Sequence, residues 1–340
     1  MLETIWFVLW GVLWAVYFML DGFDFGTGAL MPFLAKNEEE KRAMYHSLGP
    51  FWDGNEVWLI TAGGVTFAAF PWTYAVMFSS LYSALMLVLF ALIFRAVSIE
   101  FRNQVESPRW KATWDLGMFL GSLLPALLLG VAFGNIFQGI PIDGEGVYHG
   151  TLLTLLNPYG LLTGVVFVML FLVHGAIWQA IKTDGNLHQR SLSTAKKLWP
   201  ILLVISVIFL VATKFFTELW NNYLGNPVLL LIPLVPVVGL LLTRIFLASE
   251  SCWKAWFASC LTIVGCTLFG VVGLYPNMLP SSLDPAYTLT VQNSASTPLT
   301  LKIMLVVALI FVPIVIAYQV WVYVLFKDKV TKEDLVQEAY

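Results

Sequence analysis

The chain has 340 residues, of which 59% are hydrophobic and only 11% are charged, and its mean hydropathy is +0.80. Soluble domains carry about 25% charged residues, so this composition excludes an ordinary soluble protein and indicates a chain that crosses a membrane several times. The net charge of −3, without a basic patch, argues against a nucleic-acid partner.

Nine stretches are apolar enough to cross a bilayer, which requires about 20 mostly apolar residues. They are residues 5–25, 57–74, 76–98, 114–136, 151–180, 198–219, 226–247, 255–275 and 301–326. The first lacks the basic start and the cleavage site of a signal peptide, so we expect it to be retained as a span. No connection is long enough for an independent core, so residues 1–340 are predicted to form a single polytopic all-α membrane domain.

The basic residues orient these spans. With nine spans, 16 of the 18 Lys and Arg residues fall on the side of the C-terminus, and only Lys214 and Lys302 fall towards the other side. The long connection at about 276–300 contains neither Lys nor Arg. By the positive-inside rule, the N-terminus is predicted to lie outside and the C-terminus in the cytoplasm.

Two acidic residues, Asp21 and Asp24, interrupt the first span near its predicted cytoplasmic end. A charge at the centre of a membrane costs roughly 2.5–3.5 kcal/mol on insertion scales, so such a residue is expected to serve a function. Their i, i+3 spacing places both carboxyl groups on about the same helix face. Glycines at positions 22, 26 and 28 are expected to let a neighbouring helix approach closely.

A second acidic pair, Asp53 and Glu56, has the same spacing at the start of the second span, within the run Trp52-Asp53-Gly54-Asn55-Glu56-Val57-Trp58. The sequence therefore predicts a notch with four carboxyl groups at the cytoplasmic mouth of the bundle. It is consistent with a proton entry path. It is equally consistent with helix capping combined with a structural ion pair or a bound cation.

Other polar residues are explained by ordinary membrane packing. Arg95 and Glu100 are expected to extend towards the membrane interface. His174 is the one histidine within a predicted span, and we expect it to bond a neighbouring helix rather than to bind haem. The cysteines are expected to be buried thiols; they are Cys252, Cys260 and Cys266.

Three tryptophans, Trp6, Trp10 and Trp14, form a stripe on the first span. Helix packing or lipid contact explains such a stripe, and a groove lined for quinone is the alternative. Near the C-terminus, Thr331 and Asp334 have the spacing of a capping-box variant, although a solvated tail is the preferred interpretation.

Several motifs resemble subunit II of the bacterial cytochrome bd quinol oxidases, in order along essentially the whole chain. They are Asp-Gly-Phe-Asp-Phe-Gly (21–26), Gly-Pro-Phe-Trp-Asp-Gly-Asn-Glu-Val-Trp-Leu-Ile-Thr-Ala-Gly-Gly (49–64), Trp-Asp-Leu-Gly (114–117), Gly-Val-Ala-Phe-Gly-Asn-Ile-Phe-Gln-Gly (130–139), Leu-Leu-Asn-Pro-Tyr-Gly-Leu-Leu-Thr-Gly (155–164), Met-Leu-Pro-Ser-Ser (278–282) and the Thr-Lys-Glu-Asp tail. His174 lies outside these motifs, and the connection at about 219–226 is short for the family.

The resemblance implies nine spans, arranged as two four-helix bundles plus a peripheral helix, in the bacterial inner membrane. It implies a partner, subunit I, that carries two haems b and one haem d, and in some members a small single-span third subunit. The complex would oxidise quinol, reduce dioxygen to water and build a proton gradient without pumping. This chain would hold no complete active site, but some members bind a structural quinone here.

The resemblance also implies roles for particular residues. The acids that match Asp24 and Asp53 are linked in the family to a proton route, and we expect Asp21, Trp52, Asn55 and Glu56 to support it. A cyanide-insensitive branch has the same subunit layout. Two other functions remain open from the residues alone: a secondary transporter or ion channel, and a structural anchor without a proton role.

Overall fold

The computed structural model describes residues 1–331 and 333–335 and is almost entirely helical. Within these residues, eight helices are long and apolar enough to cross a membrane. They are α1 (Leu2–Leu34), α5 (Tyr82–Phe101), α6 (Pro108–Gln138), α7 (Pro158–Lys182), α8 (Gly185–Phe216), α10 (Leu231–Ala248, preceded by the 3-10 turn Pro227–Leu230), α11 (Cys252–Leu274) and α13 (Pro298–Leu325). The prediction of an all-α membrane protein is therefore confirmed.

Shorter elements connect or flank these helices. They are α2 (Glu38–His46), α3 (Trp52–Ala69), α4 (Pro71–Ser80), α9 (Leu219–Gly225), α12 (Val291–Ser294), the 3-10 turns Leu153–Leu155 and Pro285–Tyr287, and the antiparallel strands β1 (Asn277–Leu279) and β2 (Leu289–Thr290).

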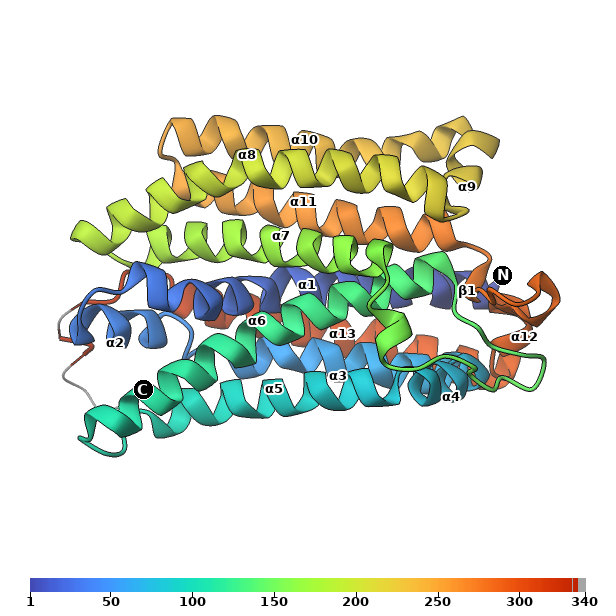
Figure 1. The fold of residues 1–340 in the computed structure, drawn as a ribbon, viewed down its shortest axis with the longest axis horizontal. Coiled ribbons are helices and arrows are strands. Elements are labelled where there is room, and N and C mark those ends of the chain that lie inside the picture. The colour runs from blue at the N-terminus through green and yellow to red at the C-terminus, as the bar shows by residue number, and fades with distance from the viewer. Residues whose placement is uncertain (332, 336–340) are drawn as a thin grey trace.

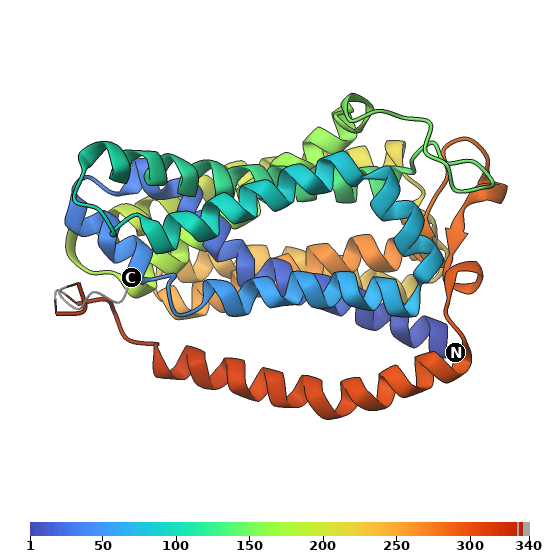
Figure 2. The ribbon, with the colours of Figure 1, turned by 90° about the horizontal axis from the view of Figure 1, so that it is seen from below.

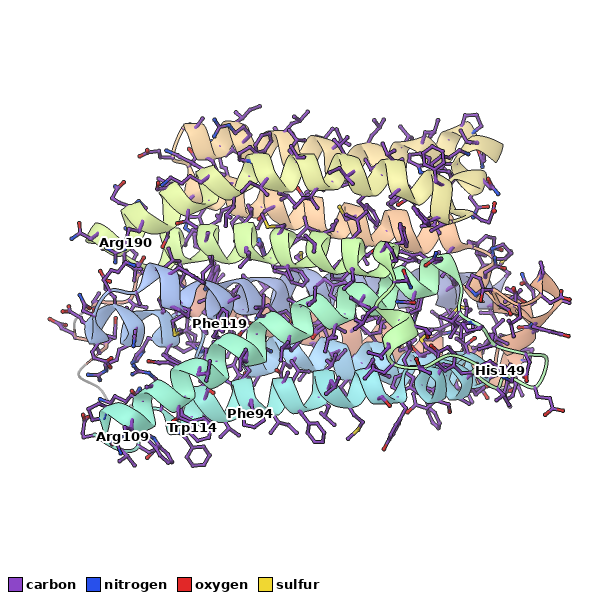
Figure 3. All side chains as sticks on the ribbon, in the orientation of Figure 1. Phe94, Arg109, Trp114, Phe119, His149 and Arg190 are labelled. Atoms are coloured by element: carbon purple, nitrogen blue, oxygen red, sulfur yellow. The ribbon has the colours of Figure 1, made fainter. Side chains whose placement is uncertain are left out.

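The helices form two groups that meet where α7 packs against α1 and α6 (Figure 1). One group contains α7, α8, α10 and α11, and the other contains α1, α3, α5 and α6. Figure 2 shows α13 along one side of the bundle, where it contacts α1 and α3, and most of its side chains are exposed. Figure 3 places Arg109 and Arg190 at one end of the bundle and His149 at the other, which is also the end of the N-terminus in Figure 1.

Helix boundaries differ from the predicted spans at the second and third segments. The second predicted span, 57–74, is divided between α3, which ends at Ala69, and α4, which begins at Pro71. The third, 76–98, is divided at Leu81 between α4 and α5. Proline suits the first turn of a helix, where no N–H partner is required, so Pro71 starts a new helix after the break.

The expected close approach at the glycines of α1 is confirmed. A Cβ atom on Gly26 would overlap the carbonyl oxygen of Phe171 on α7, and one on Gly175 of α7 would overlap the backbone of α1. A Cβ atom on Gly22 would lie 2.7 Å from the ring of Phe171. Because the two backbones touch here, the acidic segment of α1 is held firmly against the second helix group.

We expect Gly26→Ala to lower the stability of the protein by about 1–3 kcal/mol, since the added methyl group must push α1 and α7 apart. The midpoint of thermal inactivation of the purified protein measures this effect. Gly64→Ala is the matched control, because no atom lies within 4 Å of the added methyl group there. Equal midpoints for the two variants would contradict the close packing of α1 on α7.

Candidate carboxylate site

Asp21 and Asp24 are both fully buried in α1. Arg95 of α5, also fully buried, donates to Asp21 Oδ1 at 2.7 Å and to Glu56 Oε1 of α3 at 2.5 Å. The guanidinium carbon of Arg95 lies 4.3 Å from the centre of the Phe25 ring. One guanidinium group thus joins carboxyl groups from two other helices inside the bundle.

The prediction that Arg95 extends to the membrane interface is wrong. Its side chain is 0% exposed, because two carboxyl groups within the bundle satisfy its charge. Glu100, one and a half turns further along α5, is exposed as expected. Sequence patterns could not separate the two residues, since both lie at the end of an apolar helix. The partners of Arg95, Asp21 and Glu56, are 74 and 39 positions away in the chain.

Asp24 has a neutral partner. The amide of Asn55 on α3 donates to Asp24 Oδ2 at 2.7 Å and to the carbonyl oxygen of Leu20 at 3.2 Å. On its other side, Asn55 Oδ1 accepts from the hydroxyl of Tyr323 at 2.9 Å and from Gln319 Nε2 at 3.2 Å. Gln319 and Tyr323 belong to α13, and sequence reasoning missed both because their positions resemble ordinary lipid-facing sites.

The first turn of α3 faces outward. Asp53 is exposed, and its carboxylate accepts from the N–H of Gly54 at 2.6 Å. Trp52 is half-buried against the core, and Glu56 is about one-fifth exposed. The structure therefore brings Asp21 and Glu56 together through Arg95. Among the described contacts, none joins Asp53 directly to Asp24.

Several buried atoms around Asp21 and Asp24 have no partner among the described residues. They are Tyr17 Oη, Asp21 Oδ2, Asp24 Oδ1, and Nε and Nη1 of Arg95. Buried polar atoms are nearly always bonded to protein or to ordered water. This cluster therefore has hydrogen-bonding capacity sufficient to hold water molecules between its side chains.

A second ionic cluster lies at the same end, outside the bundle. Arg102 donates to Glu38 Oε2 at 2.9 Å and to Asp115 Oδ1 at 2.5 Å, and Lys41 donates to Asp115 Oδ2 at 2.8 Å. Partial burial acts to raise the pKa of Glu38, but Arg102 and Lys41 outweigh it and hold that pKa below its usual range. These pairs fix α2 against α5 and α6.

His174 does not fit a haem ligand. Its Nδ1 lies 2.5 Å from Ser259 Oγ of α11, its Nε2 lies 3.0 Å from the Met19 carbonyl oxygen of α1, and its ring stacks on Trp256. Both ring nitrogens are thus engaged, as expected for a residue that joins neighbouring helices. No cluster of three or more His, Cys, Asp or Glu side chains suited to a metal occurs in residues 1–331 and 333–335.

Two tryptophans of the stripe on α1 serve helix packing. Trp6 and Trp10 are buried; Trp6 donates to the Leu301 carbonyl at 3.0 Å and Trp10 to Thr66 at 2.9 Å. Trp14 borders an open cleft of about 870 Å³ along α3, α4 and α5. The three cysteines, all in the described part of the chain, are free thiols.

Thr331 and Asp334 form the bonds of the predicted capping-box variant. Thr331 donates its N–H to Asp334 Oδ2 at 2.7 Å, and residues 333–335 make a turn. Lys332, which contributed to the predicted charge distribution, lies outside the described residues.

The fold and this site define a multi-pass membrane protein with a buried cluster of carboxyl groups near one end. The family described as "Cytochrome bd terminal oxidase subunit II" matches residues 2–326, and the chain belongs to that family. Its members are subunits of a terminal oxidase, an oxidoreductase complex that contains haem and a partner subunit I. Family and helices together make this chain a multi-pass protein of the bacterial inner membrane.

Individual relatives cover nearly the whole chain. The "Probable cytochrome oxidase subunit 2" of Haemophilus influenzae is 38% identical over 95% of this chain and 93% of its own length. The "Cytochrome bd-I ubiquinol oxidase subunit 2" of Escherichia coli K12 is 37% identical over 100% of this chain and 98% of its own. The structure of bd oxidase from Geobacillus thermodenitrificans shares the fold, with a TM-score of 0.79, 15% identity, and coverage of 96% of this chain and 98% of that one.

Proposed function

We propose that this chain supports the haem-bearing subunit I of a quinol-oxidising bd oxidase and contributes a route for proton uptake from the cytoplasm. Asp24 is the central group of this route, and Asp53 lies at its entrance. Asp21, Glu56 and Arg95 hold the route in place. Family membership and the buried carboxyl groups of α1 support the proposal.

One observation carries the proton role: the three carboxyl groups of Asp21, Asp24 and Glu56 are accompanied by one guanidinium group, that of Arg95, which pairs with Asp21 and Glu56. If all three were ionised, the cluster would keep an excess negative charge inside the bundle, where charge is costly. Asp21 and Glu56 bond Arg95 directly, whereas Asp24 accepts from the neutral amide of Asn55. Asp24 is therefore the group that holds the exchangeable proton.

The route begins at the exposed end of α3. Asp53 is exposed, Glu56 lies one turn deeper and is partly buried, and Asp21 and Asp24 are fully buried beyond it. The unpartnered oxygens of Tyr17, Asp21 and Asp24 can bond water molecules that link these steps. Water formation by the complex consumes protons, and this path would deliver them.

We propose nine spans, with α3 as the ninth beside the eight strongly apolar helices. α3 has 18 residues and runs beside α1 through the bundle (Figure 2). Arg109 and Arg190 then lie in the cytoplasm and His149 outside (Figure 3), in agreement with the segregation of basic residues. The proton entrance at Asp53 faces the cytoplasm in this orientation.

We further propose that the haems b and d used in oxygen reduction lie in the partner subunit, since both ring nitrogens of His174 are engaged by neighbouring helices. The complex is electrogenic but does not pump. A structural quinone and a small third subunit are consistent with the family. The cleft beside Trp14 is large enough for part of a quinone, but its lining is almost wholly apolar.

We expect Asp53→Asn to slow oxygen reduction by the complex a few-fold, because an exposed carboxyl group gathers protons at the entrance. Oxygen consumption and the proton gradient in proteoliposomes measure the effect. Glu100→Gln is the control, an exposed acid at the same end of the bundle. Normal turnover with a full gradient in Asp53→Asn would remove Asp53 from the route.

A further inference from the structure

A continuous chain of hydrogen bonds runs from the peripheral helix α13 to Asp24. Trp58 Nε1 of α3 donates to Gln319 Oε1 at 2.6 Å, and Gln319 Nε2 donates to Asn55 Oδ1 at 3.2 Å. Asn55 Nδ2 in turn donates to Asp24 Oδ2 at 2.7 Å. The resemblance singled out Trp58 as part of a motif, but the proposed route does not use it.

The chemistry of Trp58 fixes the direction of every bond in this chain. An indole N–H can only donate, so Gln319 must turn its oxygen towards Trp58 and its NH₂ group towards Asn55. Asn55 must then present its own oxygen to Gln319 and its NH₂ group to Asp24. The Leu20 carbonyl, which can only accept, bonds the same NH₂ group and agrees with this orientation.

We propose that Trp58, Gln319 and Asn55 are positioning residues that determine which oxygen of Asp24 carries the exchangeable proton. Asp24 Oδ2 faces a fixed donor, so it acts as an acceptor and a proton placed there would clash with the amide. The proton must sit on Oδ1, which has no partner among the described residues. This inference rests on the proposed role of Asp24. It adds which oxygen carries the proton and which residues determine that choice.

Tyr323 reinforces the same orientation. Its hydroxyl lies 2.9 Å from Asn55 Oδ1, which can only accept, so Tyr323 donates. Gln319 and Tyr323 are one turn apart on α13, whose apolar surface is otherwise largely exposed. Either residue alone leaves Asn55 with one donor, so the loss of both is expected to exceed the sum of the single losses.

The test uses the purified oxidase complex with four variants of this chain: Trp58→Phe, Gln319→Met, Tyr323→Phe, and the last two combined. The first measurement is the infrared difference spectrum between the reduced and oxidised complex. In it, the carboxyl C=O band that disappears in Asp24→Asn reports on Asp24. The second measurement is the pH profile of oxygen reduction. Tyr318→Phe, an exposed tyrosine of the same helix, is the control.

In the combined variant, we expect the Asp24 band to move to higher frequency, because its carbonyl oxygen loses the donor that Asn55 supplied. The alkaline limb of the pH profile moves up by about one pH unit, since a lost hydrogen bond to the charged form favours the protonated form by roughly tenfold. Trp58→Phe is expected to shift the Asp24 band and the pH profile in the same direction, but by less. If the combined variant fails to assemble, Trp58→Phe still tests the proposal.

The possible failures are distinguishable. The positioning role would be overturned if the Asp24 band and the pH profile stayed unchanged in both the combined variant and Trp58→Phe. The proton role of Asp24 would then still stand. If no carboxyl band is lost in Asp24→Asn and that variant turns over normally, both the proton role and the positioning role fall. A shift in Tyr318→Phe equal to that of the combined variant would assign the effect to α13 in general and would also overturn the proposal.

Discussion

Arg95→Leu is expected to prevent stable accumulation of the subunit in the membrane. The substitution leaves Asp21 buried without the guanidinium group that pairs with it and removes the link from α5 to α1 and α3. Removing one partner of a buried ion pair typically costs about 3–5 kcal/mol, which is a large fraction of the stability of most proteins. The amount of this chain recovered in the purified complex measures the effect.

Neutralising the two acidic partners of Arg95 distinguishes the effect of unpaired charge from the effect of lost packing. If unpaired charge is the cause, then Asp21→Asn and Glu56→Gln added to Arg95→Leu restore much of the accumulation. Arg109→Leu, an exposed arginine at the same end of the bundle (Figure 3), is expected to accumulate normally. Equal accumulation of Arg95→Leu and Arg109→Leu would contradict the buried ion pair.

Asp24→Asn is expected to assemble normally but to reduce oxygen at about one-tenth of the usual rate or less, in line with the loss of a proton-transfer group. The new amide has the size of the carboxyl group and can still accept from Asn55, so the packing is kept. It cannot release a proton at any relevant pH. Steady-state oxygen consumption with a quinol substrate measures the rate.

Asp24→Glu is the matched control, because it keeps a titratable group at the same position of α1. We expect it to retain more activity than Asp24→Asn, although the longer side chain disturbs the bond to Asn55. Full activity in Asp24→Asn would leave Asp24 with a structural role only. Equal losses in both variants, with normal assembly, would assign the effect to geometry rather than to proton transfer.

Much of the fold could be predicted from the sequence, because apolar length is a local property. The apolar stretches locate the long helices, and the glycines beside Asp21 and Asp24 correctly predict close helix packing. The start of α3 at Trp52 and the separate helix α4 were not predicted. Polar residues at a helix start lower the local hydropathy, so the start of the helix is not recognised from the apolar pattern.

The site was predicted only in part, since its contacts join distant parts of the chain. The sequence placed Asp21, Asp24, Asp53 and Glu56 together at one end of the bundle, whereas the structure leaves Asp53 exposed and gives it no described bond to the other three acids. It gave no sign that Arg95 turns inward, because an arginine at the end of a span has the same local pattern whether it pairs or extends to the interface. Nor did it indicate that Gln319, 264 positions from Asn55, donates to the amide that bonds Asp24.

In the proposed function, protons for oxygen reduction pass through Asp24. The most direct test is single-turnover proton uptake, measured with a pH indicator after the fully reduced complex is mixed with oxygen. We predict that Asp24→Asn takes up protons far more slowly than the unchanged complex, while electron transfer before the first protonation keeps its rate. Uptake at the unchanged rate in Asp24→Asn would contradict the claim.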